Sequence, residues 1–239
     1  MVAQKFLVDL NKPLVCQVGH LGDAYDEWVH QPIVTKQGPR FFHNGFLEFF
    51  TQTPWWVIPT VWVPIASWFI ATSVKLGLPS NHAPPLALLG IFVWTLAEYT
   101  LHRFLFHVQT KSYWGNTLHY LLHGCHHKHP MDSYRLVFPP VAAAVLALPI
   151  WSLVKLVSTP STAPALFGGI LLGYVAYDCT HYYLHHGQPK SDMPRNLKKY
   201  HLNHHYRQWN YGFGITSPLW DKVFGTVPPP TSKADAKSR

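Results

Sequence analysis

Ten histidines stand in four short clusters, and imidazole is the side chain that proteins use most often to bind transition metals. In chain order the clusters read H-x4-H, H-x2-H-H, H-x3-H and H-x2-H-H. Ten ligands are too many for one ion, so the pattern predicts two metal ions with about five ligands each and open positions for chemistry. No catalytic side chain beyond this metal centre is predicted. The predicted ligands are His102, His107, His123, His126, His127, His181, His185, His201, His204 and His205.

Helical geometry accounts for three of the four spacings. His181 and His185 are four residues apart, so they share a helix face and reach one ion or two adjacent ions. Each H-x2-H-H cluster has two histidines three residues apart, also neighbours on a helix, and a third about 100° further round. His102 and His107 are five apart and diverge on a straight helix. That pair requires a helix end, a bend, or binding to different ions.

The elements that position these histidines are predicted to be membrane helices. Charged residues make up only 13% of the 239 residues, aromatic residues make up 15%, and ten tryptophans are present, a composition that suits lipid contact with aromatic belts. Apolar stretches cover residues 54–74, 86–106, 136–157 and 165–184, each close to the 20 or so residues that cross a bilayer. We therefore expect an all-α integral membrane fold: four transmembrane helices plus cytosolic helices that form a histidine-rich di-metal cap.

The polar segments set the expected orientation and domain boundaries. Four spans place both termini and both histidine-rich segments on one side, and the lysines and arginines there predict that this side is cytosolic. The net charge of +8 lies in segments between apolar stretches, which favours anionic lipid headgroups over nucleic acid. Three cysteines without metal-type spacing imply no disulfide framework. The expected divisions are a cytosolic N-terminal segment (1–50), a membrane domain (51–225) and a disordered tail (226–239).

Three further residues stand near the clusters. Glu98 and Asp178 each lie about one helical turn before a clustered histidine, where a carboxylate can orient a ligand ring. An equally good interpretation pairs Glu98 with Arg103 or with a helix N–H. Tyr177 and Asp178 are the candidates for binding the substrate's amide or headgroup, although Tyr177 also suits an interfacial tyrosine. Seven isolated histidines are interpreted as structural: His20, His30, His43, His82, His119, His129 and His186.

The four motifs, in this order, resemble those of the fatty acid hydroxylase (sterol desaturase) superfamily of membrane di-metal oxygenases. Within it the chain is most similar to fatty acid 2-hydroxylases. The resemblance implies an endoplasmic-reticulum enzyme that hydroxylates C2 of the fatty acyl chain of ceramide or dihydroceramide in sphingolipid biosynthesis, using O2 and electrons from cytochrome b5. It rests on the stretches QVGHLGDAYDEWVHQPI, LHRFLFH, HGCHHKHPMD, DCTHYYLHHG and YHLNHHYR.

The resemblance is to the plant-type members. Other members carry a fused cytochrome b5 domain with a haem pattern such as H-P-G-G, which residues 1–50 lack. A separate cytochrome b5 is therefore implied, and Lys198 and Lys199 are a hypothetical docking surface for its acidic face. Hydroxylating an unactivated carbon requires a redox metal, so iron is expected in turnover. Zinc is expected in isolated protein because it binds such sites more tightly than Fe²⁺.

Two alternatives remain open from the sequence. One is another lipid oxygenase of the superfamily, such as a sterol desaturase or sterol methyl oxidase. The other is a membrane metal transporter, since ionisable residues near a membrane can mark ion pathways. The sequence leaves open the acyl chain length, the stereochemistry, the physiological metal and the oligomeric state. It also leaves open whether the substrate is a free acid, an acyl-CoA or a ceramide.

Overall fold

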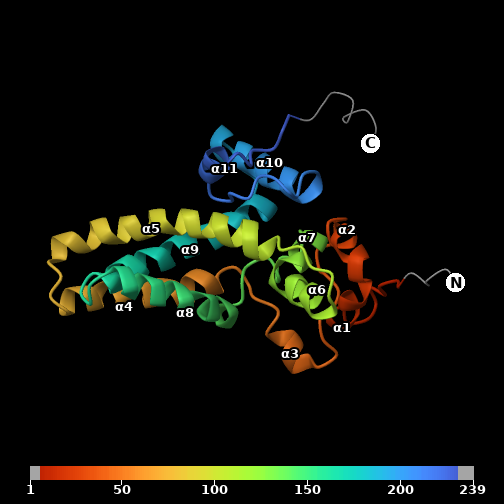
Figure 1. The fold of residues 1–239 in the computed structure, drawn as a ribbon, viewed down its shortest axis with the longest axis horizontal. Helices are drawn as coiled ribbons and strands as arrows, with labels where there is room; N and C mark the ends of the chain where they lie inside the picture. The colour runs from red at the N-terminus through yellow and green to blue at the C-terminus, as the bar shows by residue number, and fades with distance from the viewer. Residues whose placement is uncertain (1–5, 231–239) are drawn as a thin grey trace.

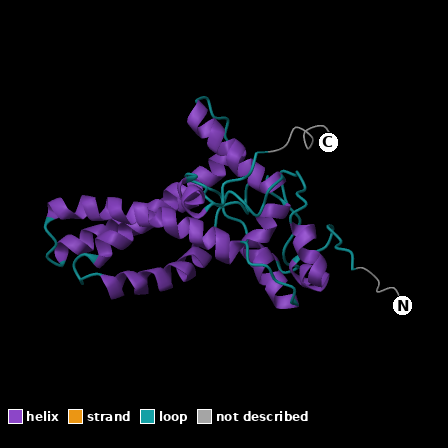
Figure 2. Ribbon diagram, turned by 45° about the horizontal axis from the view of Figure 1, so that its top comes forward, coloured by secondary structure: helices purple, strands orange, loops and turns teal. Residues whose placement is uncertain are grey.

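The computed structural model describes residues 6–230, which form helices joined by loops and contain no strand. A long helical bundle occupies one end and a cap of shorter helices the other (Figure 1, Figure 2). The first and last described residues both lie at the cap end. The predicted all-α class is confirmed. The predicted tail, residues 226–239, falls mostly outside the described residues.

Four helices form the bundle: α4 (Val57–Lys75), α5 (Ala83–Thr100), α8 (Pro140–Val157) and α9 (Ala163–His186). Three helical stretches are long and apolar enough to cross a membrane: α4, α8 and Ser80–Phe106, which contains α5. The fourth predicted span, residues 165–184, is a helix, but it is not among these three. The count of four spans therefore remains a prediction.

The position of α9 explains its weaker hydropathy. It lies between α4 and α5, and most of its residues are buried by protein. A Cβ on Gly169 would lie 2.1 Å from the carbonyl oxygen of Ala87, and a Cβ on Gly90 would lie 2.2 Å from that of Leu166. Glycine at both positions lets the two backbones touch, as small residues do between membrane helices. A helix enclosed in this way can carry polar side chains at its end.

The N-terminal segment packs into the cap. Leu14, Val18 and Tyr25 form a buried cluster with Tyr120 and Cys125. The Lys128 ammonium donates to the carbonyls of Trp28 and Gln31 at 2.8 and 2.7 Å. The α-helices of the cap are α1 (Val15–Val18), α2 (Tyr25–Val29), α3 (Gly45–Phe49), α6 (Tyr113–His119), α7 (Cys125–Lys128), α10 (Asp192–Tyr206) and α11 (Leu219–Phe224). Short 3-10 helices cover Gly19–Ala24 and Ser80–His82, and π-helices cover Leu101–Phe106 and Tyr120–Gly124.

A buried ion-pair network fixes α3 against the chain that leads into α8. Arg135 contacts the carboxylates of Glu48 and Asp132, at 2.5 and 2.9 Å. The second oxygen of Glu48 accepts from the backbone N–H groups of Phe41 and Phe42, both at 2.9 Å. Because these charges are both paired and hydrogen-bonded, their burial is tolerated. The network thus joins α3 to the segment that precedes α8.

Candidate metal centre

A π-helix resolves the five-residue spacing of the first histidine pair. Leu101–Phe106 continues α5 as a π-helix, and the His107 N–H donates to the His102 carbonyl five residues back at 3.1 Å. The wider turn brings residues five apart onto one face. The Nε2 atoms of His102 and His107 consequently lie 3.3 Å apart. The expected bend is thus a local widening of the helix, and the two rings point to the same place.

All ten clustered histidines converge at the cap end of the bundle, in two groups of five. Within a group the candidate ligand nitrogens all lie within 4.8 Å of one another. Nine of the ten side chains are buried and His107 is half-buried. The first group is His102, His107, His123, His127 and His204, and the second group is His126, His181, His185, His201 and His205.

Each group takes four histidines from one half of the chain and one from the other. His204, on α10, joins the first group, where its Nε2 lies 3.0 Å from that of His107. His126, on α7, joins the second group, where its Nε2 lies 2.9 Å from that of His181. Consecutive helical residues point about 100° apart, so His126 and His127 face different groups. The two halves of the chain are therefore interlocked through the site.

The donor atoms suit transition metals. Neighbouring Nε2 atoms lie 2.8 to 3.3 Å apart in both groups. Five inward lone pairs cannot all be satisfied by hydrogen bonds among themselves, whereas a cation satisfies them together. Two rings are oriented by hydrogen bonds from the nitrogen that faces away from the group. Nδ1 of His102 donates to the Phe213 carbonyl at 2.6 Å, and Nδ1 of His204 donates to the Tyr211 carbonyl at 2.7 Å. A proton on Nδ1 leaves Nε2 free as a ligand.

Burial keeps the cap histidines neutral. Desolvation lowers the pKa of His123 well below its usual range, and the nearby rings of His102 and His107 lower it further. Desolvation also lowers the pKa values of His127 and His205, and the next cause is the charge of His205 for His127 and that of His126 for His205. Neutral imidazole is the form that binds metal ions. The site is therefore ready to bind at neutral pH without displacing ring protons.

The carboxylates near the clusters do not touch the rings. Glu98 accepts from the Thr216 backbone N–H at 3.0 Å and from its hydroxyl. Asp178 accepts from the Phe138 N–H at 3.1 Å and the Tyr174 hydroxyl at 3.0 Å. The expectation that these two groups orient ligand rings was wrong, because neither carboxylate contacts a ring, and the carbonyls of Phe213 and Tyr211 hold His102 and His204. The alternative pairing of Glu98 with Arg103 was also wrong.

Sequence reasoning missed the position of His30. Its ring stacks on Trp209 with centroids 4.0 Å apart and lies 5.1 Å from the ring of His127 and 5.8 Å from that of His107. Its Nδ1 hydrogen-bonds to the Asp26 carbonyl at 2.8 Å, which fits the structural role expected for it. The ring nevertheless covers the outer side of the first group. An isolated histidine carries no spacing signal, so only the fold reveals this contact.

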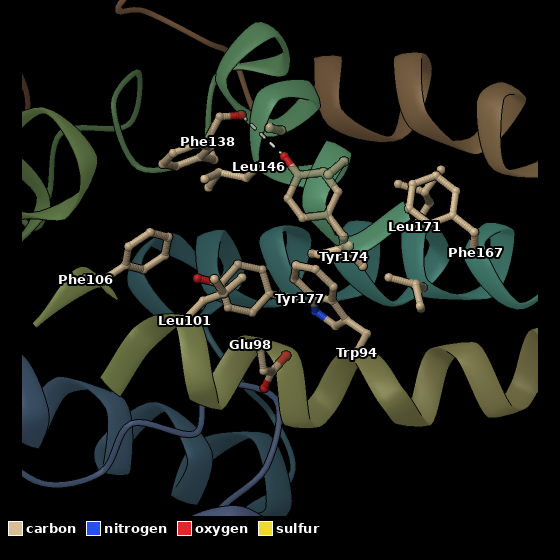
Figure 3. A pocket seen from close by; sticks show the side chains of 14 residues that line it. Trp94, Glu98, Leu101, Phe106, Phe138, Leu146, Phe167, Leu171, Tyr174 and Tyr177 are labelled. Atoms are coloured by element: carbon tan, nitrogen blue, oxygen red, sulfur yellow. Dashed lines mark hydrogen bonds between the residues drawn. The ribbon is translucent and has the colours of Figure 1, made fainter. Parts of the chain in front are cut away.

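Two cavities meet beside the second group. The outer one encloses about 840 Å³ and is walled by His123, His126 and His181 on one side and by apolar residues such as Trp56 and Val141 on the other. The inner one is narrow and runs between α5, α8 and α9, past Tyr174 and towards Phe167 (Figure 3). The side chains of Phe106, Phe138 and Tyr177 line both cavities. An apolar path therefore leads from the metal groups into the bundle.

The two predicted substrate residues lie at this junction. Tyr177 and Asp178 both line the outer cavity. The ring of Tyr177 lies between those of Trp94 and His181, with centroids 5.8 and 5.9 Å away. One oxygen of the Asp178 carboxylate, Oδ2, accepts from the Phe138 N–H and the Tyr174 hydroxyl. Their role in binding substrate stays a prediction.

Comparison with known proteins agrees with this architecture. A model of the fatty acid hydroxylase family matches residues 87–226, a range that contains all ten histidines. The chain belongs to the fatty acid hydroxylase family. The relatives of this chain are named hydroxylases. The chain is therefore an enzyme with oxidoreductase activity.

The relatives extend over most or all of the chain. Dihydroceramide fatty acyl 2-hydroxylase FAH1 of Arabidopsis thaliana is 63% identical over 239 residues, covering 100% of both chains. Fatty acid 2-hydroxylase of Homo sapiens is 43% identical over 246 residues, covering 94% of this chain and 66% of the human protein. A solved structure described as full-length scs7p, with only the hydroxylase domain visible, superposes with a TM-score of 0.88 at 43% identity, covering 95% of this chain and 87% of that one. The resemblance drawn from the sequence is confirmed.

Proposed function

We propose that this chain hydroxylates C2 of the fatty acyl chain of ceramide or dihydroceramide at a di-metal centre held by the ten histidines. The observation that carries the proposal is the opening of an apolar cavity of about 840 Å³ directly onto His123, His126 and His181. The apolar lining of this cavity suits a lipid chain. The names of the relatives support the substrate and the position of the new hydroxyl.

The ten histidines fit a pair of transition-metal ions. Each group offers five imidazole nitrogens and no carboxylate, a donor set that suits iron, copper or zinc. When bound, a redox-active pair would supply the oxygen activation that side chains cannot perform. We propose iron in turnover and zinc in protein purified without added iron. His102 and His204 are held by backbone carbonyls, so their rings keep one tautomer whichever ion binds.

The surrounding residues exclude water and position the lipid. Phe106 and Phe138 line both cavities, and their ring centroids lie 5.9 Å apart. Asp178 anchors the segment before α8 by accepting from the Phe138 N–H. This contact keeps the cavity wall in place beside His181. We propose that Tyr177 orients the substrate amide, since its ring lies next to that of His181.

The setting of the enzyme forms part of the same proposal. The metal groups lie at one end of the bundle rather than along a path through it, which supports an enzyme over a transporter. We place the enzyme in the endoplasmic-reticulum membrane with the cap in the cytosol, and divide it into segment 1–50, membrane domain 51–225 and tail 226–239. Electrons come from a separate cytochrome b5. Lys199 is exposed and free to dock it, whereas Lys198 donates to the carbonyls of His185 and Gly187.

Reconstitution tests the proposal directly. The purified chain is loaded with iron and combined in nanodiscs with cytochrome b5, its reductase, NADPH and isotopically labelled O2. With dihydroceramide we expect a product that carries one labelled oxygen at C2 of the acyl chain, located by fragmentation in a mass spectrometer. A parallel reaction contains a sterol in place of the ceramide. Oxidation of the sterol alone would contradict the proposal.

A further inference from the structure

The inner cavity is lined along its length by one face of α9. The residues that α9 contributes recur every three or four positions and so share that face; they include Phe167, Leu171, Tyr174 and Tyr177. From α8, Ala147 and Ile150 line the same cavity, three positions apart. The Tyr174 hydroxyl donates to Asp178 at 3.0 Å, a residue outside this cavity. The wall therefore offers mainly hydrocarbon to a ligand.

Three aromatic rings stand at the end of the inner cavity that is farthest from the metal groups. Figure 3 shows Phe167 at the opposite end from Phe106. The Phe167 side chain is only 5% exposed, and its ring packs on those of Phe69 and Trp151, with centroids 4.9 and 5.0 Å away. The rings of Phe69 and Trp151 are themselves 5.3 Å apart. These three residues, from α4, α8 and α9, are called the aromatic stop.

The backbone that carries the aromatic stop is also held. A Cβ on Gly168 would lie 2.7 Å from the carbonyl oxygen of Ala66, so α9 touches α4 immediately beside Phe167. Protein interiors are close-packed, and adding even one methylene group to them has a cost. A hydrocarbon chain that reaches Phe167 therefore cannot extend further without displacing packed rings.

The two cavities differ in a way that assigns the two chains of a ceramide. The outer cavity is wide, and polar side chains such as Gln52, Thr53 and Arg135 form part of its wall. It suits the long-chain base, which carries hydroxyls. The inner cavity is narrow and suits a single unsubstituted chain. Tyr177 lines both cavities with its ring 5.9 Å from that of His181, so a chain that reacts at C2 beside His181 continues past Tyr177.

We propose that the acyl chain of the ceramide occupies the inner cavity and that the aromatic stop sets the longest acyl chain that the enzyme hydroxylates. This inference rests on the proposed function. His181 and Phe167 are fourteen residues apart on α9, which corresponds to a rise of about 21 Å. An extended hydrocarbon advances about 1.3 Å per carbon, because its bonds of about 1.5 Å meet at tetrahedral angles. The cavity thus accepts acyl chains of up to about 18 carbons.

The test uses a series of dihydroceramides in nanodiscs whose acyl chains increase in steps of two carbons, from well below this limit to well above it. For the wild type we expect kcat/KM to fall about tenfold or more once the chain exceeds the limit by two to four carbons. A closed apolar pocket discriminates by at least about this factor against a single extra methylene. Mass spectrometry of the 2-hydroxylated products gives the profile.

Two variants should move the limit in opposite directions. Phe167→Ala removes a ring of the stop and should raise the limit by about two to four carbons, the length of that ring. Leu171→Phe adds a ring one helical turn nearer the metal groups and should lower the limit by about four carbons, the length of one turn. The matched control is Phe92→Ala, the same change at a phenylalanine that is 53% exposed on α5. It should keep the wild-type profile.

Binding measured without reductant separates this inference from the proposed function. Thermal stabilisation by the same lipids should show the same limit and the same two shifts even if no turnover occurs. If Phe167→Ala loses its cooperative melting, the smaller deletion Phe167→Leu replaces it, with a smaller shift in the same direction. A folded variant at Phe167 with an unchanged limit would overturn the proposal.

Two further outcomes would also overturn it. A wild-type profile that stays flat across the series, while C2 is hydroxylated, would exclude the stop and leave the proposed function intact. A second series varies the length of the long-chain base and keeps the acyl chain constant. A limit that follows the base in this series would place the base, and not the acyl chain, in the inner cavity.

Discussion

At the residue scale, His126 and His204 connect the two halves of the chain. Each is the only member of its group from its own half, and each sits next to a histidine that belongs to the other group. Adjacent histidines on a helix therefore divide between the two sites. This arrangement makes metal binding depend on the packing of α7 against α9 and α10, and not on either half alone.

Removing one of these connecting ligands should affect one site more than the other. For His126→Ala we expect the metal content to fall from two ions per chain towards one, because the second group retains only four of its nitrogens. Hydroxylation should be lost. Elemental analysis of the purified protein measures the first effect. The control is His82→Ala, at an exposed histidine outside the centre, and a similar loss of metal in this control would contradict the assignment.

His119 gives the cap a dependence on pH that is separate from the metal groups. Its Nδ1 hydrogen-bonds to the Tyr25 hydroxyl at 2.7 Å, and burial lowers its pKa from 6.5 to about 4. Between pH 6.5 and about 4, His119 binds a proton in the unfolded chain but not in the folded chain. The free energy of unfolding therefore decreases as the pH falls through this range, and His119 does not change it above pH 6.5. We expect His119→Gln to melt with a weaker dependence on pH between 7 and 5 than the wild type. Equal slopes in thermal melts would contradict this.

At the scale of elements, the contact between α5 and α9 positions the histidines that follow both helices. The closest approach is at Gly169, where a side chain would meet the backbone of Ala87. The π-helix after α5 and the last turns of α9 then deliver His102, His107, His181 and His185 to the centre. A small displacement of α9 would move His181 away from His126 on α7, whose Nε2 now lies 2.9 Å from that of His181.

Widening this contact should weaken both the fold and the metal centre. Gly169→Val forces the two backbones apart, so we expect a loss of about 1–3 kcal/mol in stability, seen as a melting temperature lower by several degrees. Metal content should fall as well. Ala144→Val is the control, since Ala144 is exposed on α8. Unchanged melting of Gly169→Val would show that α5 and α9 do not touch as described.

At the scale of the whole molecule, the bundle and the cap have different partners. The bundle exposes apolar side chains such as Trp68, Leu88 and Val145 along its length, as a membrane segment does. The cap carries the basic residues of α10, including Lys199, beside the metal centre. A lipid and a soluble electron donor can therefore reach the centre from different sides.

Charge reversal tests the proposed docking face. Lys199→Glu should raise the KM for cytochrome b5 several-fold at low salt and leave the KM for the lipid unchanged, because an exposed charge steers association. The effect should shrink as the salt concentration rises. Lys75→Glu, at the exposed far end of α4, is the control. Equal effects of the two reversals would exclude this face as the docking surface.

Much of the protein could be predicted from the sequence because it depends on residue type and local spacing. Long apolar stretches indicate membrane helices, and clustered histidines indicate metal binding. The helical class, the family and the ten histidines could therefore be predicted from the sequence. The i, i+4 pairing of His181 with His185 followed in the same way.

Tertiary structure alone decided how these parts combine. The direction of a side chain across a helix pair depends on the crossing of the two helices, which no local pattern contains. For that reason two features emerged only from the fold: His126 and His204 each join the histidine group of the other half of the chain, and backbone carbonyls hold the rings of His102 and His204. The π-helix that unites His102 with His107 belongs here too, since an unusual hydrogen-bond register persists only where packing and ligation favour it.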